Sequence, residues 1–166
     1  MEIAGKPVGG SNPTYFIADV AANHDGVLDR ALELMTLAKE AGADAAKFQH
    51  FRADHIVSDK GFRELGGQQS HQASWSKSVY EVYRDASLPW EWTKPLADHA
   101  RAIGIDFFTS PYDIDAIDFV DDFVPAYKIG SGDITWLEAI DHMASKGKPI
   151  ILATGAATLA EVENAV

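Results

Sequence analysis

The sequence of 166 residues has no cysteine, no long apolar run and few basic residues. Without cysteine there are no disulfides and no thiolate metal ligands, which fits a cytoplasmic protein. No apolar stretch approaches the roughly 18 to 20 residues that a membrane-spanning helix needs, and we expect no secretory signal. The formal net charge of −11 disfavours nucleic acid and anionic membranes as partners, because both require a basic surface.

The sequence does contain a repeated unit, in which a helix-like stretch ends in glycine and an apolar strand follows at once. Gly42, Gly104 and Gly147 occupy this position. Glycine just beyond a helix serves as a C-terminal cap because it tolerates a positive φ. The repeat therefore predicts successive αβ steps of a parallel sheet.

The hydrophobic pattern predicts five strands, at Tyr15–Ala21, Ala43–Gln49, Asp106–Ser110, Ala126–Gly130 and Ile150–Thr154. Helices are expected between them, at about Leu28–Ala41, Trp92–Ile103, Ile114–Asp121 and Leu137–Ser145. A last helix opens near Leu159, and Thr158 and Glu161 form the pattern of a capping box at its start.

The segment Arg52–Pro89 breaks this rhythm. It contains Gly66-Gly67 and is expected to be a long loop with a short helix around Val79–Arg84. Long loops after strands usually carry function. The aromatic residues in and after this segment are expected to be packing residues in preference to a platform for sugar stacking; they are Trp75, Tyr80, Tyr83, Trp90 and Trp92.

Two lysines, Lys47 and Lys128, stand at the ends of two predicted strands. A buried strand should not end in an ammonium group unless that group has a partner. In α/β folds the carboxyl ends of parallel strands are where ligands bind. Two cations at this edge of a net-negative chain predict an anionic substrate, most simply a phosphate or a carboxylate.

Asp19 lies within an otherwise apolar predicted strand, where a carboxylate needs a partner or a role. It either forms an ion pair with a strand lysine or orients or deprotonates a substrate hydroxyl. Asn23 and His24, which follow the strand, are candidate substrate contacts. His24 is more typical of a hydrogen-bonding loop residue than of a metal ligand.

Hydroxyl groups follow the later strands, in Thr109-Ser110, in Ser131-Gly132-Asp133 and at Thr154. Hydroxyls and the backbone N–H groups of tight glycine turns suit phosphate oxygens. Asp133 is equally a candidate for the N-cap of the next helix. Together with the two lysines, these residues form a candidate phosphate site.

These motifs, taken in order, resemble the N-terminal part of the sialic acid synthase family, which includes N-acetylneuraminate, pseudaminic, legionaminic and spore-coat synthases. The resemblance extends from about Phe16 to the end of the sequence. Its motifs are Ile17-Ala-Asp19 with Asn23-His24 and Gly26, Gly42-Ala-Asp-Ala-Ala-Lys47-Phe-Gln49, Phe107-Phe-Thr-Ser-Pro111, Pro125-Ala-Tyr-Lys128-Ile-Gly-Ser131-Gly-Asp133, and Lys148-Pro-Ile-Ile-Leu-Ala-Thr154-Gly155.

The resemblance implies a (β/α)₈ TIM barrel, a fold of about 250 residues, of which residues 1–166 supply about the first five βα units. The C-terminal barrel half and an antifreeze-like domain are then absent from this sequence. The implied reaction condenses phosphoenolpyruvate with an N-acylated aldose, N-acetylmannosamine or a related deoxy-amino sugar, to give a nonulosonic acid and phosphate. The alternatives are another phosphoenolpyruvate- or phosphosugar-binding barrel, or a non-catalytic fragment that acts through association.

The resemblance also implies a divalent metal, Mn²⁺ or Mg²⁺, that activates the sugar aldehyde in a homodimeric complete enzyme. The metal ligands are expected outside this chain, which we therefore expect to be inactive alone. Carried over by position, Asp19, Lys47 and Lys128 are the predicted catalytic residues. The predicted substrate-binding residues are Gln49, Thr109, Ser110, Ser131, Asp133 and Thr154.

Two departures from the family pattern concern this predicted site. Asp19 stands where the family usually has a glutamate near the acceptor sugar, and aspartate is one methylene shorter. The family commonly has Ser-Thr-Gly-Met at the end of the fifth strand, whereas this chain has Ala153-Thr154-Gly155-Ala156. A phosphate-binding hydroxyl is therefore missing there unless Thr154 substitutes for it.

Overall fold

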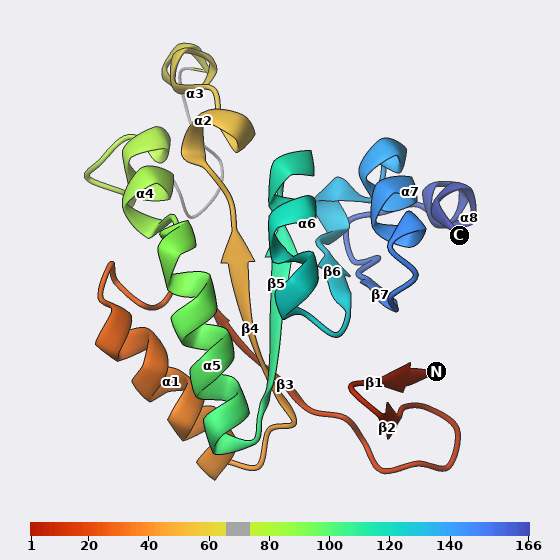
Figure 1. Cartoon of the computed structure of the whole chain (residues 1–166). Helices are drawn as coiled ribbons and strands as arrows, with labels where there is room; N and C mark the ends of the chain where they lie inside the picture. Colours follow the sequence, from red (N-terminus) through yellow and green to blue (C-terminus); the bar gives the residue numbers. More distant parts are fainter. Residues whose placement is uncertain (66–73) are drawn as a thin grey trace.

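The structure is a computed structural model that describes residues 1–65 and 74–166. Its centre is a sheet with the strand order β3-β4-β5-β6-β7, in which each neighbouring pair is parallel (Figure 1). The strands are β3 Ile17–Ala21, β4 Ala45–His50, β5 Asp106–Pro111, β6 Tyr127–Ile129 and β7 Ile150–Leu152. The parallel sheet with sequential strand order confirms the predicted α/β fold and the five predicted strands.

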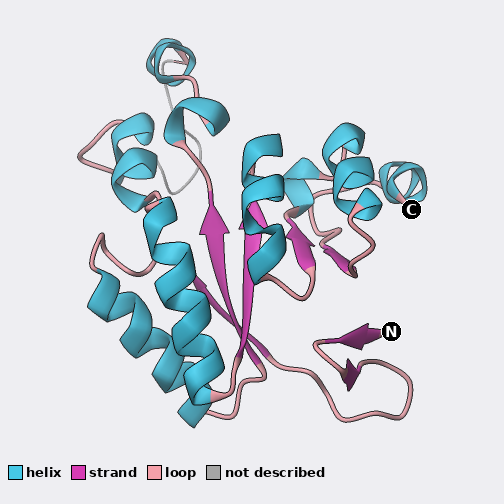
Figure 2. Ribbon diagram, in the orientation of Figure 1, coloured by secondary structure: helices cyan, strands magenta, loops and turns pink. Residues whose placement is uncertain are grey.

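Helices follow the strands as the sequence predicts, and they cover one face of the sheet (Figure 2). They are α1 Leu28–Glu40, α5 Thr93–Ile103, α6 Ile114–Val120 and α7 Leu137–Ser145, and α8 Leu159–Ala165 ends the chain. The three predicted cap glycines have φ values of +91°, +71° and +72° at positions 42, 104 and 147. The capping box of Thr158 and Glu161 is also present.

The larger hydrophobic core lies between the sheet and these helices. Phe48, Phe107 and Tyr127 of the strands pack there with residues such as Met35 of α1 and Leu96 of α5. Side chains alternate between the two faces along a strand. The residues next to these core positions therefore point to the opposite face of the sheet, which we call the inner face.

A short hairpin that the sequence pattern did not predict covers the amino end of the inner face. It consists of β1 Glu2–Ile3 and β2 Lys6–Pro7, paired antiparallel. Ile3 forms a second, smaller core with residues of β4 and β5 and with Ala126. Lys6 donates to Asp106 at 3.0 Å. Strands of two residues show no hydrophobic periodicity, which is why the pattern missed them.

The segment Arg52–Pro89 is more helical than predicted. The predicted short helix around Val79–Arg84 is confirmed as α4 Val79–Ala86. The described part also forms α2 Ala53–Ile56 and α3 Asp59–Glu64, so the long-loop interpretation was wrong there. Gly66-Gly67, on which that interpretation partly depended, lies outside the described residues. These helices stand above the carboxyl end of β4 (Figure 1). None of the helices in the described ranges has the length and apolar character needed to cross a membrane.

Candidate active site

Charged side chains meet on the inner face near the carboxyl ends of the strands. Lys47 of β4 donates from Nζ to Oδ1 of Asp19 on β3, at 2.7 Å. The Lys47 side chain is only 10% exposed, whereas that of Asp19 is 61% exposed. Asp19 therefore has the partner that a carboxylate in this strand needs, and it presents its outer side to solvent.

Lys128 of β6 lies on the same face, and β5 separates its strand from that of Lys47. Its Nζ donates to the carbonyl of Ile129 at 2.5 Å, and within residues 1–65 and 74–166 it forms no ion pair. Burial and then the positive charge of Lys47 hold the pKa of Lys128 below its usual range, while Asp19 and Asp133 act in the opposite direction. The structure thus brings the two lysines close enough to repel each other, and an anion between them would relieve that repulsion.

The turn after β6 adds Ser131 and Asp133 to this end of the sheet. Both residues lie in a 3₁₀ turn, Ser131–Asp133. Burial raises the pKa of Asp133 above its usual range, and Lys128 opposes this shift. A Cβ atom on Gly130 would lie 2.8 Å from Oδ2 of Asp133, so a larger residue at position 130 would displace this carboxyl group. The N-cap of α7 is Trp136, which makes the N-cap prediction for Asp133 wrong.

The adjacent residues Thr109 and Ser110 have different surroundings. Ser110 pairs in register with Gln49 near the ends of β5 and β4. Because side chains alternate along a strand, both residues point to the inner face, as the two lysines do. Thr109 points the other way and is fully buried, with its hydroxyl 2.7 Å from Nδ1 of His50. The structure therefore separates Thr109 from the other predicted site residues. Thr154 is exposed beyond the end of β7.

His50 is a residue of structural importance that the sequence reasoning missed. Its Nε2 lies 2.7 Å from Oγ1 of Thr93 at the start of α5, and its Nδ1 contacts Thr109 on β5. Burial lowers the pKa of His50 to about 4, so the ring is neutral at pH 7. It ties the ends of β4 and β5 to α5. The sequence held one signal for this role: His50 is two residues after Phe48, so the alternation of side chains along β4 turns it towards the helix-facing core.

His24, a candidate substrate contact, is also turned into the core. The ring is fully buried and packs edge-on against Trp92, with a distance of 5.5 Å between the ring centroids. Its Nδ1 accepts a hydrogen bond from the backbone of Gly26. Burial lowers the pKa of His24. This residue therefore supports the turn after β3 and does not face the lysines.

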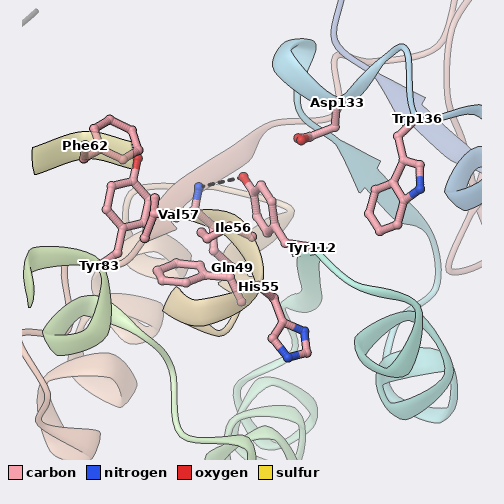
Figure 3. Close-up of a pocket in the computed structure, with 10 residues that line it drawn as sticks. Gln49, His55, Ile56, Val57, Phe62, Tyr83, Tyr112, Asp133 and Trp136 are labelled. Atoms are coloured by element: carbon pink, nitrogen blue, oxygen red, sulfur yellow. Dashed lines mark hydrogen bonds between the residues drawn. The ribbon is translucent and has the colours of Figure 1, made fainter. Parts of the chain in front are cut away.

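A cavity of about 560 Å³ lies at the carboxyl end of the sheet, with Gln49, Tyr112 and Asp133 among its lining residues (Figure 3). Gln49 and Asp133 connect it to the inner face, but among the described residues that line it there is no lysine. Gln49 donates to the hydroxyl of Tyr112 at 3.3 Å. Burial and then the charges of Asp133 and Asp19 raise the pKa of Tyr112 to about 12, so its hydroxyl keeps its proton at pH 7.

The residues present do not fit the divalent metal that the resemblance implies. The described parts of the chain contain no group of three or more histidine, aspartate or glutamate side chains placed to hold a metal ion. On the inner face, the charges of Asp19 and Asp133 are offset by those of Lys47 and Lys128. A set of side chains that includes two ammonium groups suits an anion and repels a divalent cation.

Comparisons with known proteins support the resemblance seen in the motifs. Residues 34–166 match the model of the NeuB family. The chain is 39% identical over 162 residues to the N,N'-diacetyllegionaminic acid synthase of Legionella pneumophila, with 97% of this chain and 45% of that protein covered. It is 38% identical over 153 residues to a pseudaminic acid synthase of Campylobacter jejuni, with 89% and 43% covered.

The fold resembles that of the N-acetylneuraminic acid (sialic acid) synthetase from Leptospira borgpetersenii, solved in complex with citrate. The TM-score is 0.82 at 26% sequence identity, over 99% of this chain and 53% of that one. This chain spans less than half of the length of the two sequence relatives and corresponds to their N-terminal part. From its motifs, its fold and these matches, we conclude that the chain belongs to the NeuB family.

Proposed function

We propose that this chain carries the phosphoenolpyruvate-binding part of a nonulosonic acid synthase. Such an enzyme joins phosphoenolpyruvate to an N-acylated aldose and releases phosphate. The observation that carries the proposal is the pair Lys47 and Lys128, which lie on one face of the sheet although the chain is strongly net-negative. The relatives named as legionaminic and pseudaminic acid synthases support the same reaction class.

Phosphoenolpyruvate carries a phosphate and a carboxylate, so it needs more than one cation. Lys128 forms no ion pair in the described part of the chain and is the cation free to bind it, while Asp19 shares Lys47. Ser110 and Ser131 supply hydroxyl donors at the same strand ends. Binding in this partly buried place strengthens each of these contacts, because the local dielectric constant is lower than that of water.

In the proposed reaction, C3 of phosphoenolpyruvate forms a bond to the aldehyde carbon of the acceptor, and the aldehyde oxygen takes up a proton. Addition of water at C2 then leads to the release of phosphate. Asp19 is the residue that we assign to the acceptor, because its carboxylate lies at the open edge of the lysine face. We place the metal ligands implied by the family outside this chain and assign no step here to the metal.

The test is a reaction of the full-length protein with phosphoenolpyruvate, Mn²⁺ and a panel of N-acylated aldoses. Phosphate release is measured together with the mass of the product. We expect phosphate release that depends on the sugar, and a 2-keto acid longer than the sugar by three carbons. Phosphate release that needs no sugar, or turnover only with a phosphosugar that lacks an N-acyl group, would contradict the proposal.

A further inference from the structure

The amino group of Lys128 has different surroundings from that of Lys47. Lys47 pairs with Asp19 at 2.7 Å. Lys128 is half-buried, forms no ion pair within residues 1–65 and 74–166, and donates from Nζ to the carbonyl of Ile129 at 2.5 Å. A neutral amine can also donate such a hydrogen bond. No hydrogen-bonded carboxylate among the described residues therefore fixes this side chain in its charged form.

The surroundings of Lys128 also activate it as an amine. Burial and then the charge of Lys47 lower the pKa of Lys128, against the opposing effects of Asp19 and Asp133. Desolvation and a neighbouring cation are two ways in which proteins turn a lysine into a nucleophile that attacks a carbonyl carbon. The residue lies on the inner face near the carboxyl ends of the strands, where parallel α/β folds bind ligands. The ammonium form of Lys128 can bind an anion, whereas its neutral form can attack a carbonyl group.

The carboxyl group of Asp133 lies over the end of the same strand. Its Oδ2 is 2.8 Å from the place of a Cβ atom on Gly130, and Gly130 follows Lys128 by two residues. Burial raises the pKa of Asp133, and the charge of Lys128 opposes this shift. A raised pKa favours the protonated carboxyl group, which can donate a proton. The inner face therefore combines a nucleophile, a second cation in Lys47 and an acid.

We propose that Lys128 is a covalent binding site for small 2-keto acids, and that its amino group forms an imine with their C2 carbonyl group. The positive charge of Lys47 attracts the carboxylate next to that carbonyl. The lone pair of Nζ forms the bond to C2, and an electron pair of the C=O bond moves to the oxygen. This oxygen takes up one proton from the amine and one from Asp133, and it leaves as water. The result is an iminium ion on Lys128 and an ionised Asp133.

This inference goes beyond the proposed function. It needs neither phosphoenolpyruvate nor an acceptor sugar, because it describes a reaction of the protein itself with a carbonyl compound. The product of the proposed reaction is also a 2-keto acid, so an imine would hold that product on the inner face and slow its release. Pyruvate has the same carboxylate and C2 carbonyl in a small molecule, and it is therefore the probe for this site.

The first experiment treats the full-length protein with pyruvate and sodium borohydride, which reduces an imine to a stable secondary amine. Peptide mapping by mass spectrometry locates the carboxyethyl group that this reduction leaves. We expect it on Lys128 and far less on Lys60, whose side chain is 83% exposed and which is the control within the same sample. In urea the two residues should be labelled equally, because unfolding removes the surroundings that activate Lys128. Equal labelling in the folded protein, or labelling of Lys47 in place of Lys128, overturns the inference.

The second experiment changes the acid. Asp133→Asn keeps the size of the side chain but removes the proton donor, and it should slow the labelling of Lys128 by roughly 10²-fold. Asp133→Glu, which keeps a carboxyl group, should restore most of the rate. Asp122→Asn, at an exposed position, is the matched control, and a thermal melt confirms that each variant is folded. An unchanged rate in a folded Asp133→Asn variant overturns the inference.

The labelling also separates this inference from the proposed function, because it needs no turnover. A full-length protein that releases phosphate in a sugar-dependent reaction, but is not labelled at Lys128, overturns this inference alone. A protein that is labelled at Lys128 but releases no phosphate with any of the sugars supports this inference and contradicts only the proposed function.

Discussion

His50 on the helix-facing side of the sheet and Lys128 on the inner face differ in the partners of their polar groups. On the helix-facing side, both ring nitrogens of His50 have threonine partners, and the hydroxyl of Tyr127 donates to Asp121 at 2.6 Å. On the inner face, Lys128 is half-buried and donates to a backbone carbonyl without an ion pair among the described residues. Tyr127 and Lys128 are consecutive residues, so one step along β6 separates the two situations.

This difference indicates which side of the sheet binds a ligand. Buried polar groups that stabilise a fold are usually fully hydrogen-bonded, as they are around His50. Charged groups of one sign that are held together without enough partners cost stability unless a ligand completes them. We therefore expect substitutions on the inner face to reduce activity, and substitutions around His50 to reduce stability.

The largest effect is expected from Asp19→Asn in the full-length protein. If Asp19 acts on the acceptor, turnover should fall by roughly 10²- to 10⁴-fold, the usual contribution of a general acid–base group. The KM for phosphoenolpyruvate should change little. Steady-state kinetics with each substrate varied in turn measure both values, and Asp25→Asn, at an exposed turn residue, is the control. An equal loss of phosphoenolpyruvate binding would show that Asp19 only holds Lys47.

Lys128→Met should have the next largest effect. Removing the ammonium that is free for the anion should reduce kcat/KM for phosphoenolpyruvate by roughly 10²- to 10³-fold, as loss of one preorganised electrostatic group does in other enzymes. Lys60→Met is the matched control, because the Lys60 side chain is 83% exposed on α3. If both variants lose the same modest amount, the inner face would not be the anion site.

His50→Asn tests the stabilising face through pH. Above about pH 6.5, the ordinary pKa of histidine, His50 is neutral in the folded and unfolded states, and its contribution is complete. Below pH 6.5, His50 binds a proton in the unfolded chain. In the folded chain it stays neutral until the pH approaches its lowered pKa of about 4. Stability should therefore fall by an amount on the order of 3 kcal/mol between pH 6.5 and pH 4.

Urea unfolding at several pH values measures this dependence. The His50→Asn variant should be less stable at pH 7 but should lose that part of the pH slope. His142→Asn, which changes a surface histidine paired with Asp118, should keep it. An identical slope in the wild-type protein and His50→Asn would mean that His50 does not stay neutral in the fold.

The smallest effect, close to zero, is expected when Mn²⁺ is added to the isolated chain of 166 residues. A ligand raises the melting temperature only when the folded state holds its site, and no metal-ligand group is found in residues 1–65 and 74–166. We also expect this chain to be oligomeric or poorly soluble, because edge strands promote association. A monodisperse monomer that gains several degrees with Mn²⁺, seen in a thermal melt beside light scattering, would contradict both expectations.

The sequence predicted the elements that depend on local signals. Helix α7 has the predicted bounds Leu137–Ser145, and the capping box at Thr158 was read directly from its spacing. The hairpin of β1 and β2 and the helices α2 and α3 were missed. All of these segments are too short for hydrophobic periodicity. The hairpin is stabilised by tertiary packing, since Ile3 belongs to the same buried cluster as Phe108.

The candidate site, too, was predicted from the sequence only in part. That Lys47 and Lys128 lie on two strands of one parallel sheet followed from the sequence, but the prediction that they end those strands was wrong, because both stand inside them, in β4 Ala45–His50 and β6 Tyr127–Ile129. The sequence did not reveal the cavity, because its wall combines Phe62 and Tyr83 with Trp136 from the opposite side. Residues so distant along the chain meet only after the helices have packed.

The sequence by itself determined the parallel α/β architecture, the placement of two lysines on strands of the sheet and the membership of the NeuB family, since all three depend on residue types and spacings along the chain. The tertiary structure alone decided that Ser110 shares the inner face while Thr109 bonds to His50, and that Asp19 pairs with Lys47 across 28 residues. Strand side chains alternate with a period of two, so a shift of one residue in register moves a side chain to the opposite face of the sheet. Partners far apart in sequence become neighbours only through packing.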